Sequence, residues 1–364
     1  MVKLTVRDIL CAGGLLWIGQ AQGAAFASDI PDTVDAPSAT QGTAATTAAS
    51  GANTPGAVLL NVLSYNIQGL PSPIKSNKTP LFERIAEILR ERRAAGRQPE
   101  IVLLQEAFDA DASLIAENTG YGYVLKGPGR KAQSEKGSVH WAMQTRKSYV
   151  SFNDPQKFTG SGLYILSDFP IVEAQHKAFD SDMCAGIDCL SNKAILLARV
   201  QVPGISAPVD IINSHFNSRS SAKAPSRHVL RAHQRQTDTL AWFMDKLCVN
   251  APVIVGGDFN TRQSERYDYF RKALPLVDAA EDCLTPGRSC RLGTDTVREA
   301  VLYNTNDKQF FREAAGYSIV ATHIERNFSE KLDGRELSDH LGYEVTYKIM
   351  PRASQTGTQE WAAP

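Results

Sequence analysis

Several apolar segments of this chain end in a polar side chain that can bind a metal ion or a phosphate. These polar residues are Asn66 after VLSY, Glu106 after IVLLQ, His215 and Asn217 in INSHFN, Asp258 and Asn260 in VIVGGDFN, and Asp339 and His340 in LSDH. One such residue is usually a turn former or a cap. A whole set of carboxylates, amides and imidazoles is better explained by a pre-organised site, because strand ends are rigid and their loops open to solvent.

Strands and helices alternate along the chain. A helix is expected from Thr79, as its N-cap, with Pro80 at the first helical position, and a second helix spans 226–248. Short apolar runs bounded by turn residues predict strands at 58–67, 101–104, 161–166, 195–202, 209–213, 252–255 and 343–349. This order predicts an α/β fold, a two-layer β-sandwich flanked by helices.

The N-terminus has the layout of a secretory signal peptide over residues 1–27. Lys3 and Arg7 precede an apolar run that is short for a membrane span, and Ala25-Phe26-Ala27 offers a cleavage site before Ser28. An N-terminal membrane anchor is the alternative, which the cleavage site disfavours. We therefore expect a secreted or periplasmic protein.

The rest of the chain divides by composition. Residues 28–56 are rich in Ala, Thr, Ser, Pro and Gly and predict a flexible leader, whereas 57–350 predict one folded catalytic domain and 351–364 a disordered polar tail. The 43% of hydrophobic residues excludes a wholly disordered chain. With 39 Lys+Arg against 39 Asp+Glu, a wide basic surface for nucleic acid is not expected, although a small basic groove stays possible in principle. We expect a monomer.

Export permits disulfides. Cys184 and Cys189 lie in one turn-like segment, and Cys283 and Cys290 in another, so we expect nearest-neighbour pairing, with the other pairings left open by the sequence alone. Cys248, at the end of the second helix, is expected to be a buried free thiol. A zinc site is not expected, because the chain has no C-x-x-C pair.

The ordered motifs YN, LLQE, SH-x-N, GGDFN and SDH resemble the signature of the endonuclease/exonuclease/phosphatase superfamily over residues 58–349. The resemblance implies a two-sheet α/β sandwich that hydrolyses phosphoesters with a divalent metal ion. Three central segments resemble those of secreted bacterial neutral sphingomyelinases, which favours a phospholipid over nucleic acid. They are GSGLYILSDFPI (160–171), CAGIDCLSNKA (184–194), and INSHFNSR followed by RHVLRAHQRQ (227–236).

The resemblance also implies roles for the polar residues. Glu106, Asn66 and Asp339 are expected to hold Mg²⁺, with Mn²⁺ or Co²⁺ as alternatives, because these ions prefer oxygen ligands. His340 is expected to be the general base. Asp258 would orient the attacking water or hold a metal.

The remaining roles concern the phosphate and the second imidazole. His215 is expected to stabilise the transition state or protonate the leaving oxygen, and Asp307 to pair with His215 and set its tautomer. Asn260, Asn217 and Lys193 are expected to bind the phosphate, with a solvated lysine as the equal alternative for Lys193. His233 is interpreted first as part of a solvated basic helix face.

The leading hypothesis is a sphingomyelinase of the phospholipase C type, which hydrolyses sphingomyelin at a membrane surface to ceramide and phosphocholine. The rivals are an exported DNase-like nuclease and a phosphatase acting on phosphoinositides or another small phosphoester. A non-catalytic binding module is disfavoured, because the chain retains every motif residue.

The sequence gives a weaker signal for membrane binding than for the catalytic residues. Membrane-attacking sphingomyelinases carry an aromatic hairpin before the final Ser-Asp-His, whereas 317–337 here offers only Tyr317 and Phe328. The alternative aromatic cluster, which we interpret first as an ordinary core or crossover cluster, consists of Trp141, Tyr149, Phe152 and Phe158.

Overall fold

The computed structural model describes residues 56–70, 77–132, 157–262, 264–293 and 305–352. The predicted signal peptide and nearly all of the predicted leader lie outside these residues, as do Trp141, Tyr149 and Phe152. The described residues belong to one structural unit. No helix among them is long and apolar enough to cross a membrane.

Two β-sheets form the centre of this unit. The first has the order β10-β12-β15-β1-β2-β4-β3, with β1 Val58–Gly69, β2 Ile101–Ala107, β3 Tyr123–Lys126, β4 Tyr164–Ser167, β10 Arg291–Leu292, β12 Tyr317–Asn327 and β15 Gly342–Pro351. The second has the order β5-β6-β7-β8-β11-β9, with β5 Ile171–Ala178, β6 Ala194–Val200, β7 Val209–His215, β8 Val253–Asp258, β9 Val277–Asp278 and β11 Asp307–Arg312. A short hairpin pairs β13 Lys331–Leu332 with β14 Arg335–Glu336.

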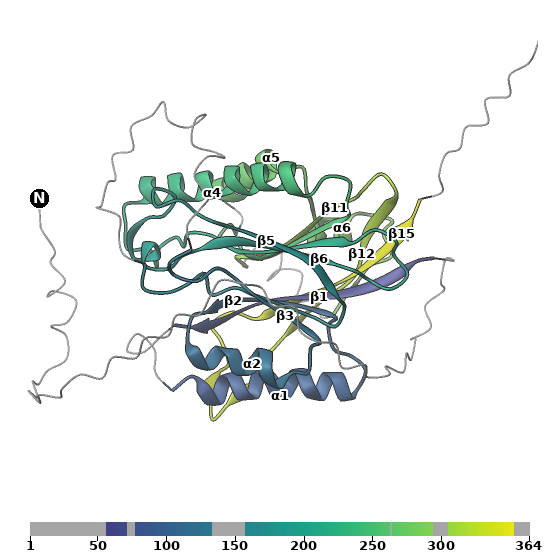
Figure 1. Cartoon of the computed structure of the whole chain (residues 1–364), viewed down its shortest axis with the longest axis horizontal. Helices are drawn as coiled ribbons and strands as arrows, with labels where there is room; N and C mark the ends of the chain where they lie inside the picture. Colours follow the sequence, from purple (N-terminus) through teal and green to yellow (C-terminus); the bar gives the residue numbers. More distant parts are fainter. Residues whose placement is uncertain (1–55, 71–76, 133–156, 263, 294–304, 353–364) are drawn as a thin grey trace, which may run out of the picture. The chain divides into compact units, whose positions relative to one another are not determined.

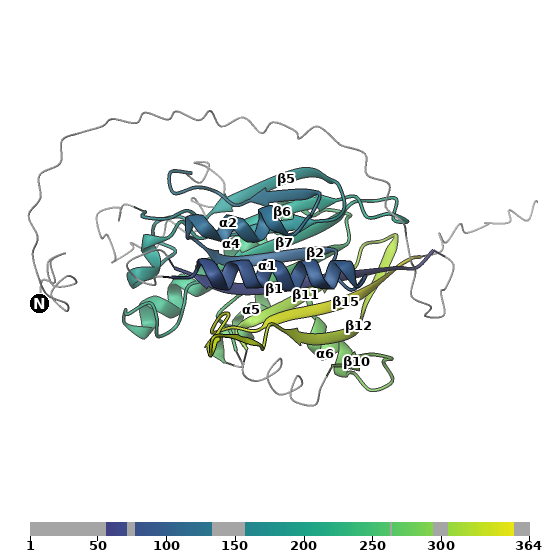
Figure 2. The same ribbon diagram turned by 90° about the horizontal axis from the view of Figure 1, so that it is seen from below.

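Helices cover the outer faces of both sheets. Figure 1 shows α1 (Thr79–Ala94) and α2 (Ser113–Asn118) over the first sheet, with α4 (Ser226–Leu247) and α5 (Glu265–Ala273) over the second. Figure 2 shows α1 lying along β1 and β2, and α6 (Ala279–Leu284) near β10 and β12. Short 3₁₀ turns occupy Ala110–Ala112 and Gly186–Leu190. The predicted fold class is confirmed.

Apolar side chains fill three layers. Leu60, Leu103 and Ile254 belong to the cluster between the sheets. Phe82 of α1 packs in a second cluster on the outer face of the first sheet, and Phe243 of α4 packs in a third against the second sheet. Each helix thus buries its apolar stripe against one sheet, which is the main source of its stability.

Two element starts differ from the sequence-based expectation. The first helix begins at Thr79 with Lys78 as its N-cap, because the Thr79 hydroxyl bonds to the carboxylate of Asp111 instead of capping the helix. The strand expected from Ser161 begins at Tyr164. Gly162 has a φ of 67°, a left-handed conformation that interrupts an extended strand.

The sheets are joined by buried amides near one end of the sandwich. Asn213 accepts a hydrogen bond from Gln105 Nε2 (2.8 Å) and donates to the carbonyls of Leu104 and Tyr164 (2.9 Å each). Gln309 Nε2 donates to the carbonyls of Val62 and Tyr343 (2.8 Å each). These bonds satisfy buried carbonyls and hold the two sheets in a fixed relation.

The cysteines behave as predicted. Cys184 bonds to Cys189 and Cys283 to Cys290, and Cys248 is a buried free thiol. Phe328 is also buried, with its ring stacked 4.5 Å from that of Tyr65, so it is not an exposed membrane anchor. Phe158, the one member of the alternative cluster within the described residues, is exposed.

Candidate active site

The topology brings six strand ends to one edge of the sandwich. β1 and β2 run parallel in one sheet, and β7 and β8 run parallel in the other, so their carboxyl ends point the same way within each sheet. β15 is antiparallel to β1, and β11 is antiparallel to β8. The starts of β15 and β11 therefore lie beside the ends of β1 and β8, which gathers the predicted polar residues.

Gly257 explains the double glycine before Asp258. Its φ is 152°, and a Cβ atom there would lie 2.0 Å from the carbonyl oxygen of Ser214. Only glycine fits between these strands at this close approach. The register then places Asp258 directly beside His215 on one side and Asp307 on the other.

Two carboxylates and one amide form the deepest part of the site. Asn66 Nδ2 donates to Glu106 Oε1 and to Asp258 Oδ2, both at 3.0 Å, while Asn66 Oδ1 accepts from the backbone N–H of Gln68 (3.0 Å). Burial raises the pKa of Glu106, and burial raises that of Asp258 to about 6. Desolvation of the two carboxylates thus outweighs the opposing effect of the nearby Lys193 and His340 charges, which favour the ionised forms.

His215 lies beside these carboxylates and contacts a lysine. Its Nε2 is 3.5 Å from Asp258 Oδ2, 3.9 Å from Glu106 Oε1 and 3.1 Å from Lys193 Nζ. Lys193 is buried and also donates to the Phe216 carbonyl (2.7 Å) and to Asp188 (3.2 Å), so it is not a solvated lysine. Burial, then the charge of Lys193, lowers the pKa of His215 well below its ordinary value.

His340 has the opposite environment. Its Nδ1 is 2.7 Å from Asp307 Oδ2, and its Nε2 is 3.8 Å from Asp258 Oδ2. Burial alone would lower the pKa of His340, but the charge and hydrogen bond of Asp307, with smaller effects of Asp258 and Asp339, raise it to about 11. The side chains around His340 favour the imidazolium.

The predicted pairing of Asp307 with His215 was wrong. Asp307 starts β11 on the far side of β8 from His215, and its carboxylate turns toward the loop before β15, where His340 lies. His215 Nδ1 is buried and has no hydrogen-bond partner among the described residues. The sequence could not show which histidine would reach Asp307, because that depends on the strand order across the second sheet.

The remaining predicted residues divide into two groups. Asn260 lies at the cavity wall and donates from Nδ2 to the Phe216 carbonyl (3.2 Å), and Asp339 is exposed at the same cavity. Asn217 is fully buried. Its Oδ1 accepts from the Ala185 N–H (2.8 Å) and its Nδ2 donates to the Ser218 carbonyl (2.9 Å), so its amide supports the loop and does not face a phosphate.

His233 also departs from the expectation of a solvated helix face. It is fully buried, and its Nε2 bonds to the Phe259 carbonyl (2.9 Å). Burial, then the charge of Arg266, lowers its pKa to about 3. His233 therefore braces the loop that follows Asp258 and does not belong to a basic surface.

The donor set suits a divalent metal ion. Ligand atoms of Glu106, His215 and Asp258 lie within 4.8 Å of one another, as do those of Asp258, Asp307 and His340. Hard oxygen ligands with imidazole are compatible with Mg²⁺, Mn²⁺ or Co²⁺. Asn66 holds the carboxylates of Glu106 and Asp258 together beside the His215 imidazole, so these residues fit such an ion. Asp339 belongs to neither ligand group within the described ranges.

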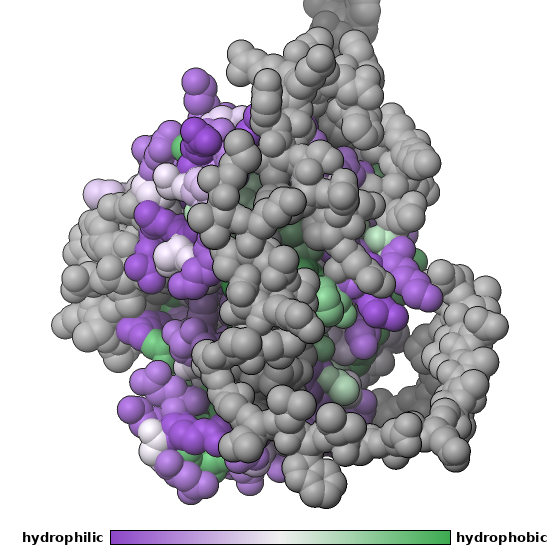
Figure 3. Space-filling view, turned by 90° about the vertical axis from the view of Figure 1, so that its left-hand side faces the viewer, coloured by the Kyte–Doolittle hydropathy of each residue, from purple (hydrophilic) through white to green (hydrophobic). Residues whose placement is uncertain are grey.

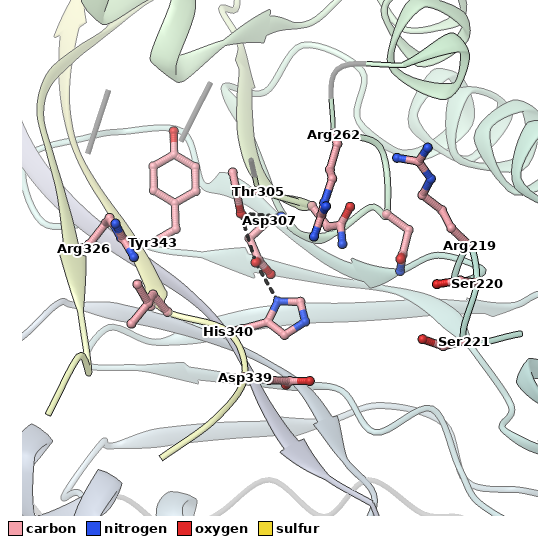
Figure 4. Close-up of a pocket in the computed structure, with 14 residues that line it drawn as sticks. Arg219, Ser220, Ser221, Arg262, Thr305, Asp307, Arg326, Asp339, His340 and Tyr343 are labelled. Carbon is pink, nitrogen blue, oxygen red and sulfur yellow. Dashed lines mark hydrogen bonds and ion pairs between the residues drawn. The ribbon is translucent and has the colours of Figure 1, made fainter. Parts of the chain in front are cut away.

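A cavity of about 680 Å³ opens in front of His340 and Asp307. Figure 4 shows the His340–Asp307 hydrogen bond at its centre, with Thr305 bonded to Asp307 on the far side. Three arginines that the sequence interpretation missed also line it, namely Arg219, Arg262 and Arg326. Arg219 follows His215 in the motif SHFNSR and Arg262 follows Asn260 in DFNTR, so proximity to the two motifs was the available signal.

The curated relatives of this chain are sphingomyelinases. Those of Mycobacterium tuberculosis and Mycobacterium bovis are each 26% identical to it over 293 residues, which is 77% of this chain and 51% of the relative. The chain thus spans about half the length of the curated relatives it matches.

Solved structures share the fold. Beta toxin from Staphylococcus aureus has a TM-score of 0.56 at 20% identity, and sphingomyelinase C from Streptomyces griseocarneus has 0.53 at 22%, each covering 79% of this chain and 99% of its own. TDP2 of D. rerio, solved with a single-strand DNA product, has a TM-score of 0.53 at 20% identity and covers 79% of this chain and 98% of its own. Fold similarity at this identity does not separate lipid from nucleic acid.

The family model described as the endonuclease/exonuclease/phosphatase family matches residues 63–340. This range includes the predicted polar residues from Asn66 to His340. The match and the sphingomyelinase relatives support a phosphodiester hydrolase, as the motifs predicted. The chain belongs to the endonuclease/exonuclease/phosphatase family.

Proposed function

We propose that this protein is an exported, Mg²⁺-dependent phosphodiesterase that hydrolyses sphingomyelin to ceramide and phosphocholine. The observation that supports it most is that ligand atoms of Glu106, His215 and Asp258 lie within 4.8 Å of one another, next to the His340–Asp307 pair that lines the cavity. The curated relatives carry the name sphingomyelinase, and the two disulfides agree with an oxidising compartment.

Glu106 and Asp258 would hold the metal ion, with His215 beside them and Asn66 bonded to both carboxylates. When bound, a divalent ion would supply positive charge to the phosphoryl oxygens and oppose protonation of His340. Asn66 then acts by orienting the two carboxylates, because its own oxygen is already bonded to Gln68.

His340 is placed to take the proton of the attacking water. Asp307 occupies Nδ1, so only Nε2 faces the cavity, and the Asp307 carboxylate stabilises the imidazolium that forms. Attack on phosphorus breaks the bond to the ceramide oxygen, and that oxygen leaves with a proton. One proton passes from the attacking water to His340 and the ceramide oxygen takes one from solvent. His340 then returns its proton to solvent, so the protons balance over one turnover.

Lys193 supplies positive charge on the opposite side of Asp258. Its ammonium is buried and directed by bonds to Phe216 and Asp188, and it lies 3.1 Å from the neutral His215. Charge that is fixed in a buried site stabilises a transition state more than the same charge in water. Of the two roles expected for His215, its lowered pKa favours stabilisation over proton donation.

The test is an assay of purified protein on sphingomyelin, phosphatidylcholine and DNA, each with Mg²⁺ and with EDTA. We expect phosphocholine release from sphingomyelin that EDTA abolishes. Glu106→Gln should need a higher Mg²⁺ concentration, whereas His176→Ala, on the exposed part of β5, should behave as wild type. DNA cleavage without lipid turnover would refute the proposal.

A further inference from the structure

Three guanidinium groups line the cavity without carboxylate partners. Arg219 comes from the loop after β7, Arg262 from the loop after β8 and Arg326 from β12. Within the ranges that the structure describes, none of them forms an ion pair. Figure 4 shows Arg219 and Arg262 on one side of His340 and Arg326 on the other.

Two of these arginines are in energetically unfavourable surroundings. Arg262 has a φ of 43°, which is unfavourable for a residue with a side chain and is common where loops are held for function. Arg326 is half-buried, and burial lowers its pKa, so its charge is partly removed from water without a paired carboxylate. Both costs are offset if an anion binds in the cavity.

The cavity holds more positive than negative charge. Its two carboxylates are Asp307, which is bonded to His340, and Asp339, which is exposed. A quaternary ammonium is recognised by aromatic faces, but the aromatic side chain that lines this cavity, Tyr343, is buried in the core. Guanidinium groups instead match the geometry of phosphate and carboxylate.

We propose that Arg219 and Arg262, which lie on the same side of His340, bind a second phosphate on the substrate, beside the phosphodiester that is cleaved. The substrates of this site then include phospholipids whose head group carries a further phosphate. This inference goes beyond the proposed function, in which sphingomyelin carries one phosphate and a cationic choline. The zero net charge of the chain favours such a local anion site over an extended nucleic-acid groove.

Binding in EDTA tests the cavity without the metal ion. Calorimetry should show 1,3-bisphosphoglycerol binding at least about tenfold tighter than phosphocholine. Arg219→Gln and Arg262→Gln should each weaken bisphosphate binding by about tenfold, because each removes one charge-assisted contact. Arg231→Gln is the matched control, since Arg231 is exposed on α4 outside the cavity. Equal affinity for the two probes, or equal effects of all three variants, would overturn the proposal.

Turnover of three substrates then separates the two proposals. With Mg²⁺ we expect cleavage of cardiolipin, in which a second phosphate lies three carbons from the first. Arg219→Gln and Arg262→Gln should each lower its kcat/KM by about tenfold while changing that of sphingomyelin less than about twofold. An equal loss on both lipids would assign the arginines to the cleaved phosphate. A loss confined to DNA would assign them to nucleic acid. Bisphosphate binding without cleavage of any lipid would sink the proposed function and keep the anion site.

Discussion

The two histidines of this site occupy corners with opposite electrostatics. The His340 corner consists of His340 and Asp307, and its carboxylate favours the imidazolium. The His215 corner consists of His215 and Lys193, and its ammonium and its burial favour the neutral ring. Asp258 lies between the corners, 3.5 Å from one Nε2 and 3.8 Å from the other. The surroundings of the two histidines thus shift their pKa values in opposite directions.

Each corner is anchored to the other sheet by an amide two residues away on its own strand. Gln309 follows Asp307 on β11 and bonds to β1 and β15, while Asn213 precedes His215 on β7 and bonds to β2 and β4. Residues two apart on a strand share a face, so the amide and the functional residue both point into the sandwich. Buried amide hydrogen bonds therefore hold both corners in the same way, and the corners differ in the charge of the residue that contacts each histidine.

The largest effect is expected from His340→Ala. Loss of the proton acceptor should lower kcat by about 10²–10⁴ without unfolding the protein. The measurement is single-turnover hydrolysis of sphingomyelin at saturating Mg²⁺, with circular dichroism as the folding control. His323→Ala, on β12, should keep wild-type turnover. An unchanged rate in His340→Ala would remove that histidine from proton transfer.

Asp307→Asn separates the charge of this corner from its geometry. The amide leaves a hydrogen-bond partner near Nδ1 but removes the charge that raises the pKa of His340. As the proposed general base, His340 would work in its neutral form. A lower pKa would keep that form at lower pH and move the acid limb of the kcat/KM profile to lower pH. The plateau should fall by about 10², because the imidazolium loses its stabilisation. An acid limb that stays in place or moves to higher pH would contradict this role.

The sequence predicted the members of the site better than their partners. Asn66, Glu106, His215, Asp258 and His340 follow apolar strands in recognisable motifs, and parallel strand ends meet at one edge. The partner of Asp307 was not predictable, because it depends on contacts between segments that are distant along the chain.

The burial of polar residues was also not predictable from the sequence. Gln309 is a polar residue on β11, and yet it is fully buried because its amide bonds to two carbonyls of the first sheet. His233 looked solvated because arginines flank it on α4, and it faces inward instead. Periodicity shows which face is buried, but it does not show that a polar side chain on that face has found partners.

Lys193→Met tests the His215 corner and should have a smaller effect. Turnover should fall by about tenfold through loss of one fixed positive charge. The affinity for Mg²⁺ should rise, because Lys193 is a nearby cation that competes electrostatically for Glu106 and Asp258. Titration of activity with Mg²⁺ measures both. Lys223→Met, in the exposed loop before α4, is the control, and a weaker Mg²⁺ affinity in Lys193→Met would contradict the assignment.

The smallest effects on activity are expected from the two anchoring amides. Gln309→Leu leaves the carbonyls of Val62 and Tyr343 without this donor, and Asn213→Leu does the same to those of Leu104 and Tyr164. Each change should lower the free energy of unfolding by about 1–3 kcal/mol, because a buried carbonyl is left unsatisfied. Urea unfolding measures this loss.

The two variants should differ in which corner they loosen. Gln309→Leu should alter the acid limb that depends on His340 and Asp307, whereas Asn213→Leu should leave that limb in place and alter the Mg²⁺ dependence at the His215 corner. Each change in turnover should be within about tenfold, since the functional groups themselves remain. If both variants shift both properties equally, the amides hold the sandwich as a whole and the corners are not independent.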